Sequence, residues 1–169
     1  PLVSSSAASD VYKRQERKPL RLDELVAGVV TDAEFEAQAD EKDVTFESQE
    51  VNLVGDPVLL RSAAENVVRN ALRHTPVGSR VSVILESGSD TCRIHVRDEG
   101  PGVPESQLED IFNPFTRTEE ARERSSGGFG LGLAIARRAM LAHGGGSSAR
   151  NHPEGGLEVS LWLPLGDES

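Results

Sequence analysis

The sequence predicts an α+β fold: a two-layer α/β sandwich in which a mixed, mostly antiparallel sheet of about five strands is covered on one face by about three helices. Two observations support it. Three segments carry apolar residues at helical spacing, and strand-like segments with alternating apolar residues lie among them. Strands and helices do not alternate strictly, which disfavours a doubly wound parallel sheet. The length of 169 residues suits one domain with its own core.

The composition of the chain argues against several classes of function. The formal net charge is -10, from 28 acidic and 18 basic side chains, which argues against binding to nucleic acid or to an anionic membrane. Cys92 is the only cysteine, which excludes a disulfide framework and is typical of a reducing compartment. Apolar windows such as Val81–Leu85 are too short to cross a bilayer. We therefore expect a cytoplasmic location without direct membrane contact.

The two ends of the chain differ from its middle. Residues 1–15 are rich in serine and alanine and show no periodicity, so we expect a non-native or disordered segment there. A linker is expected at residues 16–22, one domain at residues 23–166 and a short tail at residues 167–169. Because the chain opens on proline, we expect it to be a fragment of a longer protein.

The first half of the domain begins with an amphipathic pattern from Leu22 to about Asp40, which predicts a helix. Two short alternating runs, Val44–Ser48 and Val51–Val54, are predicted to be strands that pair with each other. Gly55-Asp56-Pro57 then predicts a turn and a helix cap. A long helix should follow and end at Thr75-Pro76.

The second half should supply the rest of the sheet. Strands are predicted at Val81–Leu85 and Cys92–Val96, which place Asp98 just beyond a strand end. We also expect a short helix at Glu105–Phe112, a polar lid-like loop over Thr116–Gly127, a helix at Leu131–Ala142 and a strand at Leu157–Leu163.

Three groups of residues are candidates for chemistry, and each has a simpler explanation. Asn66 and Asn70 stand one helical turn apart and could ligate Mg²⁺, although polar residues at a helix edge are usually just solvated. Asp98 could accept a hydrogen bond from the amine of adenine, or belong only to a tight turn. The glycine-rich run Gly128–Leu133 before a helix could hold phosphates or act as a hinge, and it lacks the P-loop pattern.

These motifs occur in an order that is similar to a known family. Glu65–Thr75, Asp98–Gly102, Ile111–Phe115 and Gly128–Leu133 resemble the N, G1, F and G2 boxes of sensor histidine kinases, particularly those of envelope-stress type. The likeness extends over roughly Leu22 to Leu165. It implies the ATP-binding fold shared with DNA gyrase, mismatch-repair ATPases and heat-shock chaperones, with ATP and Mg²⁺ as cofactors.

The resemblance also implies roles for individual residues. Asn70 would bind Mg²⁺ with Asn66 assisting, and Arg73 would contact the phosphates. His74 would pack beside the nucleotide, and Asp98 would recognise adenine by a hydrogen bond. The further nucleotide contacts that it implies are Gly100, Gly102, Val103, Phe115, Gly128, Phe129, Gly130, Leu131, Gly132 and Leu133.

The segment between the F and G2 boxes carries three arginines, Arg117, Arg122 and Arg124. Such lid arginines could neutralise charge on the transferred phosphoryl group, Arg117 and Arg122 being the catalytic candidates, or they could be solvated loop residues. Two residues depart from the family pattern: Phe129 replaces a small residue, and His74 stands where tyrosine is frequent.

The function implied is donation of the ATP γ-phosphoryl group to a histidine on a separate dimerisation domain, with a response regulator downstream. None of the four histidines lies in the His-acid-apolar setting of an acceptor, so the chain alone should not phosphorylate itself. The alternatives are a stand-alone ATPase and an anti-sigma-type serine kinase or regulatory nucleotide-binding module. The ATPase is disfavoured because Asn66 stands where such enzymes place a glutamate, and Glu65 is turned roughly 100° away.

Overall fold

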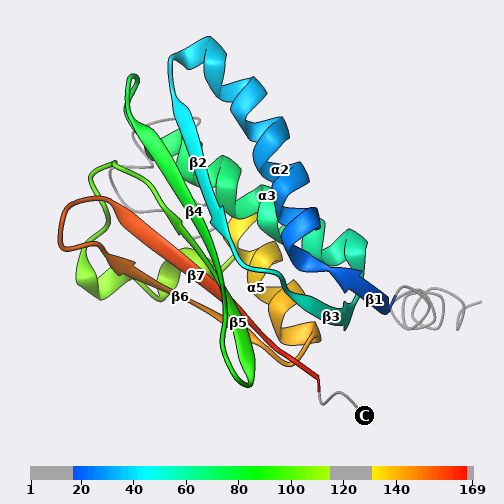
Figure 1. Cartoon of the computed structure of the whole chain (residues 1–169). Helices are drawn as coiled ribbons and strands as arrows, with labels where there is room; N and C mark the ends of the chain where they lie inside the picture. Colours follow the sequence, from blue (N-terminus) through cyan, green and yellow to red (C-terminus); the bar gives the residue numbers. More distant parts are fainter. Residues whose placement is uncertain (1–16, 115–130, 167–169) are drawn as a thin grey trace, which may run out of the picture.

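The structure, a computed structural model, describes residues 17–114 and 131–166. It contains two layers, a sheet and a set of helices packed on one of its faces (Figure 1). Within these ranges the α-helices are α2 (Leu22–Ala37), α3 (Pro57–His74) and α5 (Gly132–Ala142). The two-layer α+β architecture predicted from the sequence is confirmed.

The main sheet has five strands in the order β2-β4-β5-β7-β6. Only β2 and β4 run parallel, and the other neighbours are antiparallel, as expected for a mixed sheet that is mostly antiparallel. The strands are β2 (Asp43–Ser48), β4 (Arg80–Ser87), β5 (Thr91–Arg97), β6 (Gly146–Asn151) and β7 (Leu157–Pro164).

One predicted strand pairing is wrong. Strand β3 (Asn52–Gly55) pairs antiparallel with β1 (Lys18–Arg21) in a separate two-stranded sheet, and not with β2. The three residues between β2 and β3, Gln49, Glu50 and Val51, include no glycine or asparagine, the residues that tight hairpin turns favour. Instead, the Gln49 N–H donates to the Leu85 carbonyl (3.1 Å), so the chain continues along β4. The expected linker at residues 16–22 thus contains a strand and the first residue of α2.

Two further elements differ from the prediction. Strand β6 was not predicted, because its sequence, Gly-Ser-Ser-Ala-Arg-Asn, has little of the β-branched or aromatic character of a strand. The single helix expected over Glu105–Phe112 is two short 3-10 turns, η2 (Glu105–Gln107) and η3 (Asp110–Phe112). A third such turn, η1 (Gln38–Asp40), completes the first predicted helix after α2.

Helix α3 runs through the centre of the helical layer. Asp56 caps it by accepting hydrogen bonds from the Val58 and Leu59 N–H groups at 2.9 and 3.2 Å, and Pro57 occupies its first turn. Its predicted apolar face is buried as expected, at Leu60, Ala63, Ala64, Val67, Val68 and Ala71. Among the described residues, no helix is both long and apolar enough to span a membrane.

The junction of β1 and α2 is held by one carboxylate. Both oxygens of Asp23 accept hydrogen bonds from the Arg21 guanidinium, at 3.0 and 2.6 Å, and Oδ1 also accepts from the Val51 N–H at 3.2 Å. The hydrogen bonds from Arg21 lower the pKa of Asp23 to about 2. This carboxylate therefore ties the start of α2 to the segment that enters β3.

We expect Asp23→Asn to lower the free energy of unfolding at pH 7 by about 1–2 kcal/mol, because it removes charged hydrogen bonds. A carboxyl whose pKa is lowered on folding stabilises the fold above its unfolded pKa, here 3.8, and that contribution is lost as the pH falls through about 2. The deficit of the variant should therefore shrink in urea unfolding at pH 3. An equal deficit at both pH values would contradict this role of Asp23.

Candidate functional site

The C-terminal half of α3 presents the two predicted asparagines. Asn70 is 6% exposed, and its side-chain amide makes no hydrogen bond to any of the described residues. The amide nitrogen of Asn66 donates to the Ser62 carbonyl (2.8 Å). Its oxygen faces the start of α5, 3.3 Å from where a Cβ at Gly132 would stand. Both amides thus keep an oxygen available for a ligand.

Asp98 lies just beyond the end of β5 and is 2% exposed. Its Oδ1 accepts hydrogen bonds from the Gly100 N–H (2.8 Å) and the Leu157 N–H (3.1 Å). Among the described residues, no donor reaches Oδ2. Burial raises the pKa of Asp98, and the two N–H donors oppose that shift. The arrangement leaves one carboxylate oxygen able to accept a hydrogen bond from an amine.

The Asp98–Gly102 turn packs against the end of α3. The Glu99 N–H donates to the Thr75 hydroxyl (2.9 Å), directly after the last residue of that helix. A Cβ at Gly100 would stand 2.4 Å from the His74 carbonyl oxygen, so a side chain there would force the turn away from the helix. The two motifs, 24 residues apart in sequence, therefore meet in space.

The far end of the turn is fixed by Asn151, a residue that the sequence reasoning missed. Its amide accepts from the Val103 N–H (3.0 Å) and donates to the Val103 carbonyl (2.7 Å). Gly102 has a φ of 72°, and a Cβ there would meet the Asn151 oxygen at 2.4 Å. No local pattern marks Asn151, because its position depends on the unpredicted strand β6.

The described part of the glycine-rich motif begins at Leu131, which is exposed, and continues into α5. Gly132 lies beside Asn66, as described above, and Leu133 is fully buried in the core. Arg73 is exposed and His74 is partly buried at the end of α3. The remaining predicted residues lie outside the described ranges: Phe115, Arg117, Arg122, Arg124, Gly128, Phe129 and Gly130.

Glu65 points away from this site. Its carboxylate accepts a hydrogen bond from the Arg61 guanidinium (2.9 Å) and lines a groove between α2 and α3. The edge of α3 that faces the strand end and α5 carries amides instead. An amide cannot take a proton from water, so neither Asn66 nor Asn70 can act as the general base that a glutamate supplies in a hydrolase.

Comparison with known proteins agrees with this geometry. Residues 55–167 match the family described as "Histidine kinase-, DNA gyrase B-, and HSP90-like ATPase". The chain is 43% identical to the sensor histidine kinase CpxA of Escherichia coli K12 over 148 residues, which are 86% of this chain and 32% of that protein. It is 35% identical to the sensor protein CutS of Streptomyces coelicolor, covering 89% of this chain and 36% of CutS. The chain thus spans about a third of the length of these relatives.

Solved structures show the same fold. The mycobacterial sensor histidine kinase MprB superimposes with a TM-score of 0.78 at 27% identity, covering 87% of this chain and 97% of the other. The catalytic domain of histidine kinase ThkA, in a nucleotide-free form, gives a TM-score of 0.77 at 26% identity, covering 88% and 97%. The chain therefore belongs to the histidine kinase-, DNA gyrase B- and HSP90-like ATPase family of nucleotide-binding domains, and within that family it is similar to the catalytic domains of sensor histidine kinases.

Proposed function

We propose that this chain binds ATP together with Mg²⁺ and donates the γ-phosphoryl group to a histidine on a separate dimerisation domain of a parent sensor kinase. The observation that carries the proposal is the meeting of three motifs. The Asp98 turn lies against the end of α3 at His74, and Asn66 on the same helix lies against Gly132 at the start of α5. Both the Asp98 turn and the start of α5 therefore contact α3, the helix that also carries Asn70.

We propose that Asp98 recognises the adenine base. Its Oδ1 is held by two backbone N–H groups, which fixes the carboxylate and leaves Oδ2 to accept from the exocyclic amine. Gly100, Gly102 and Val103 form the turn that would border the base. Guanine carries a carbonyl oxygen where adenine carries this amine, so an ionised Asp98 would repel it.

The chemistry of the donors fits Mg²⁺. Within the described residues, no group of three or more histidine, cysteine or acidic side chains could hold a metal ion. Mg²⁺ is often held by few protein oxygens, with waters and substrate phosphates as its other ligands. We assign the amide oxygen of Asn70 as its protein ligand and that of Asn66 as an assisting one. When bound, the ion would neutralise charge on the phosphates.

Positive side chains would complete the phosphate site. Arg73, one turn beyond Asn70, is exposed at the end of α3, and we assign it to the phosphates. His74 next to it would pack beside the nucleotide. We further assign Arg117 and Arg122 to charge neutralisation during transfer, and the glycines of the Gly128–Leu133 run to backbone contacts with the phosphates.

The remaining partners follow from the kind of reaction. Transfer needs an acceptor in line with the γ-phosphate, and we propose that a histidine of the parent kinase's dimerisation domain supplies it. A receiver domain of a response regulator would then take the phosphoryl group. We place the domain on the cytoplasmic side of the membrane that would hold its parent, where ATP is available.

The test is phosphoryl transfer between separate proteins. The purified domain is mixed with a dimeric histidine-bearing domain of a related kinase and γ-labelled ATP, with an acceptor lacking its histidine as the control. We expect acid-labile label on the acceptor and none on the domain alone. Nucleotide binding with no labelled histidine would contradict the proposal, and acid-stable label on serine would favour the serine-kinase alternative.

The stand-alone ATPase makes a different prediction. If Glu65 activated water, steady release of phosphate would occur without an acceptor and would stop in Glu65→Ala. Because Glu65 pairs with Arg61 in the groove between α2 and α3, we expect this substitution to leave nucleotide binding and phosphoryl transfer unchanged.

A further inference from the structure

The hairpin of β6 and β7 holds the Asp98 turn at two points. Leu157, the first residue of β7, exchanges two hydrogen bonds with Asp98: its N–H donates to Oδ1 (3.1 Å), and its carbonyl accepts from the Asp98 N–H (3.0 Å). Asn151, the last residue of β6, bonds to both backbone groups of Val103, at 3.0 and 2.7 Å. Asn151 and Leu157 are direct partners in the antiparallel register. One cross-strand pair therefore fixes both ends of the turn.

The turn has little hydrogen bonding of its own. Among the described residues, no backbone–backbone hydrogen bond involves residues 100–103. The Gly100 N–H donates to the side chain of Asp98 (2.8 Å), whereas the Val103 N–H and carbonyl bond to the Asn151 amide. Val103 is buried, and buried backbone polar groups are costly to leave unpaired. The far end of the turn therefore depends on one side chain.

The hairpin that carries this side chain is braced at its tip. The His152 N–H donates to the Gly156 carbonyl (2.8 Å), and the Gly155 N–H donates to the His152 carbonyl (2.9 Å). The Arg97 guanidinium, at the end of β5, donates to the Gly155 carbonyl at 3.0 and 3.2 Å. The hairpin is thus bonded to itself and to the strand that precedes the turn, which makes it a fixed support.

An amide matches the backbone of Val103 in both directions. Its oxygen accepts from the N–H while its nitrogen donates to the carbonyl, as a neighbouring strand would. A carboxylate would keep the first bond but place a second acceptor against the carbonyl oxygen. The contact is also close, because a Cβ at Gly102, whose φ is 72°, would stand 2.4 Å from the Asn151 oxygen. The backbone of the turn therefore lies directly against the amide.

We propose that Asn151 is a positioning residue that sets the selectivity of the nucleotide site for adenine. The inference rests on the proposed function, in which Oδ2 of Asp98 accepts from the adenine amine and Val103 borders the base. Because Asn151 holds Val103 at a fixed separation from Asp98, a base that packs against Val103 is aligned with Oδ2. Adenine gains a hydrogen bond there, whereas guanine places its carbonyl oxygen against the carboxylate. Release of Val103 lets the base shift, and the discrimination is lost.

Asn151→Ala tests this role by titration with non-hydrolysable ATP and GTP analogues, each with and without Mg²⁺. We expect the affinity for the ATP analogue to fall about tenfold and that for the GTP analogue to change by less than about twofold. The factor by which Mg²⁺ strengthens binding should stay that of the wild type, because the amides of α3 are untouched. Partial unfolding would lower both apparent affinities by the same factor, so a changed ATP-to-GTP ratio separates positioning from loss of structure.

Asn151→Asp, which has nearly the same shape, is the second variant. At neutral pH its ionised carboxylate cannot donate to the Val103 carbonyl, so selectivity should fall as in Asn151→Ala. A protonated carboxyl both donates and accepts, so the variant should regain wild-type selectivity as the pH is lowered through the titration of the new side chain. Asp98 and His152 titrate in both proteins, and the ratio of variant to wild type at each pH removes their contribution.

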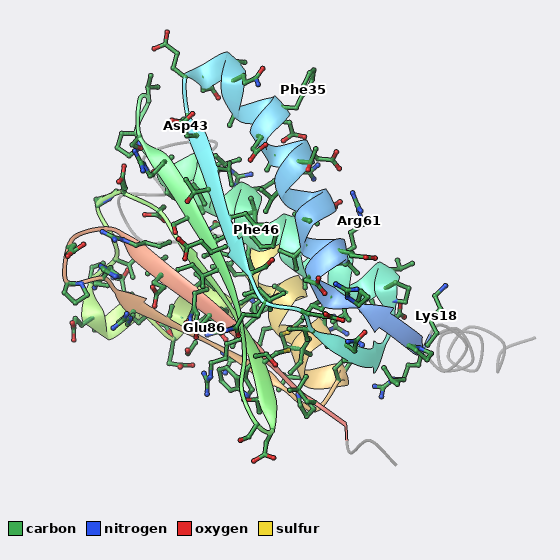
Figure 2. All side chains as sticks on the ribbon, in the orientation of Figure 1. Lys18, Phe35, Asp43, Phe46, Arg61 and Glu86 are labelled. Carbon is green, nitrogen blue, oxygen red and sulfur yellow. The ribbon has the colours of Figure 1, made fainter. Side chains whose placement is uncertain are left out.

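Two substitutions elsewhere in the sheet are matched controls. Arg150→Gln removes an ion pair with Glu158 (2.9 Å), one residue from Asn151 in the same strand. Glu86→Gln weakens a contact with His95 (3.2 Å) near the end of β4 that is remote from the turn (Figure 2). Both variants should keep the ATP-to-GTP ratio of the wild type.

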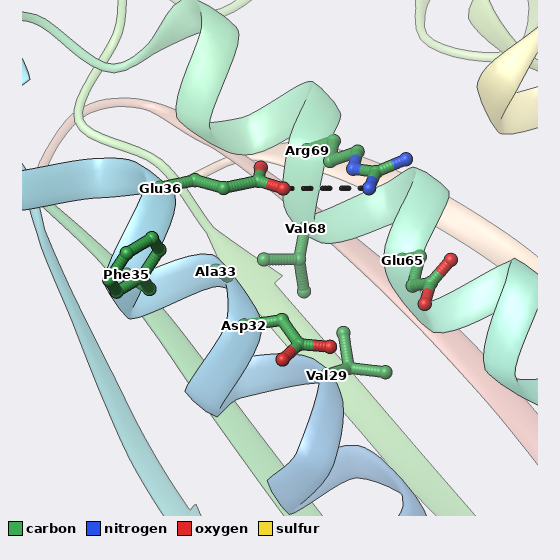
Figure 3. A pocket seen from close by; sticks show the side chains of 8 residues that line it. All are labelled: Val29, Asp32, Ala33, Phe35, Glu36, Glu65, Val68 and Arg69. Carbon is green, nitrogen blue, oxygen red and sulfur yellow. Dashed lines mark ion pairs between the residues drawn. The ribbon is translucent and has the colours of Figure 1, made fainter. Parts of the chain in front are cut away.

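A third control lies in the helical layer. Glu36→Gln removes the ion pair with Arg69 in the groove between α2 and α3, and it should leave both affinities unchanged (Figure 3). Wild-type selectivity in Asn151→Ala, or an equal loss of affinity for both analogues, would overturn the inference. If Asp98→Asn loses selectivity while Asn151→Ala retains it, only the role of Asn151 is contradicted. A wild type without preference for adenine would overturn the proposed function and this inference with it.

Discussion

Asp98→Asn is expected to weaken binding of a non-hydrolysable ATP analogue about 10- to 100-fold and to remove the preference for adenine over guanine. The substituted amide can still accept from the Gly100 and Leu157 N–H groups, so the turn keeps its shape. The group in place of Oδ2, however, becomes a donor and cannot accept from the adenine amine. Calorimetric titration with ATP and GTP analogues measures both effects.

The same substitution should not destabilise the fold at neutral pH. Because burial raises the pKa of Asp98, its carboxyl favours the folded state below the unfolded pKa of 3.8, and this contribution is lost as the pH rises through the raised folded value. The asparagine variant should thus gain stability relative to the wild type as the pH rises. Asp90→Asn, at an exposed turn, is the matched control and should leave affinity unchanged. Unaltered nucleotide affinity in Asp98→Asn would remove Asp98 from the site.

Gly156→Ala is expected to lower the free energy of unfolding by more than about 3 kcal/mol, whereas Gly155→Ala should cost only about 1–2 kcal/mol. Both glycines have positive φ, 87° and 105°, so both substitutions strain the backbone. Only at Gly156 would the new Cβ also stand 1.8 Å from the Asp98 carbonyl oxygen, while at Gly155 nothing lies within 4 Å. Urea unfolding of the two variants separates backbone strain from the clash.

The clash should also reach the site. A Cβ at Gly156 pushes the Asp98 backbone away from Leu157, whose N–H and carbonyl both bond to Asp98. We therefore expect the Gly156 variant to lose nucleotide affinity at temperatures where it remains folded, and the Gly155 variant to keep it. Equal stability of the two variants would show that the close packing of β7 against the Asp98 turn is not required.

The sequence predicted correctly the elements that depend only on the local spacing of apolar side chains and on helix capping. The apolar face of α3 and the Asp56-Pro57 cap were predicted correctly, because helical spacing and capping chemistry are local. The meeting of the Asp98 turn with α3 was predicted only through the family resemblance. Its physical cause is visible in the structure alone, where Gly100 packs against the His74 carbonyl at the end of α3.

Pairing between distant strands could not be predicted. The partner of β3 is β1, whose short sequence Lys-Pro-Leu-Arg carries no alternation that a pattern could detect. Strand β6 has a polar sequence and is held by its antiparallel register with β7. Asn151 was missed for the same reason, since only that register brings it to Val103.

The central claim is that Asn70 holds a metal ion beside the nucleotide that Asp98 recognises. The most direct measurement is calorimetric titration of the wild type and Asn70→Ala with an ATP analogue, each with and without Mg²⁺. We predict that Mg²⁺ strengthens binding to the wild type and has little effect on the variant, whose metal-free affinity stays close to that of the wild type. Equal enhancement by Mg²⁺ in both proteins would contradict the account.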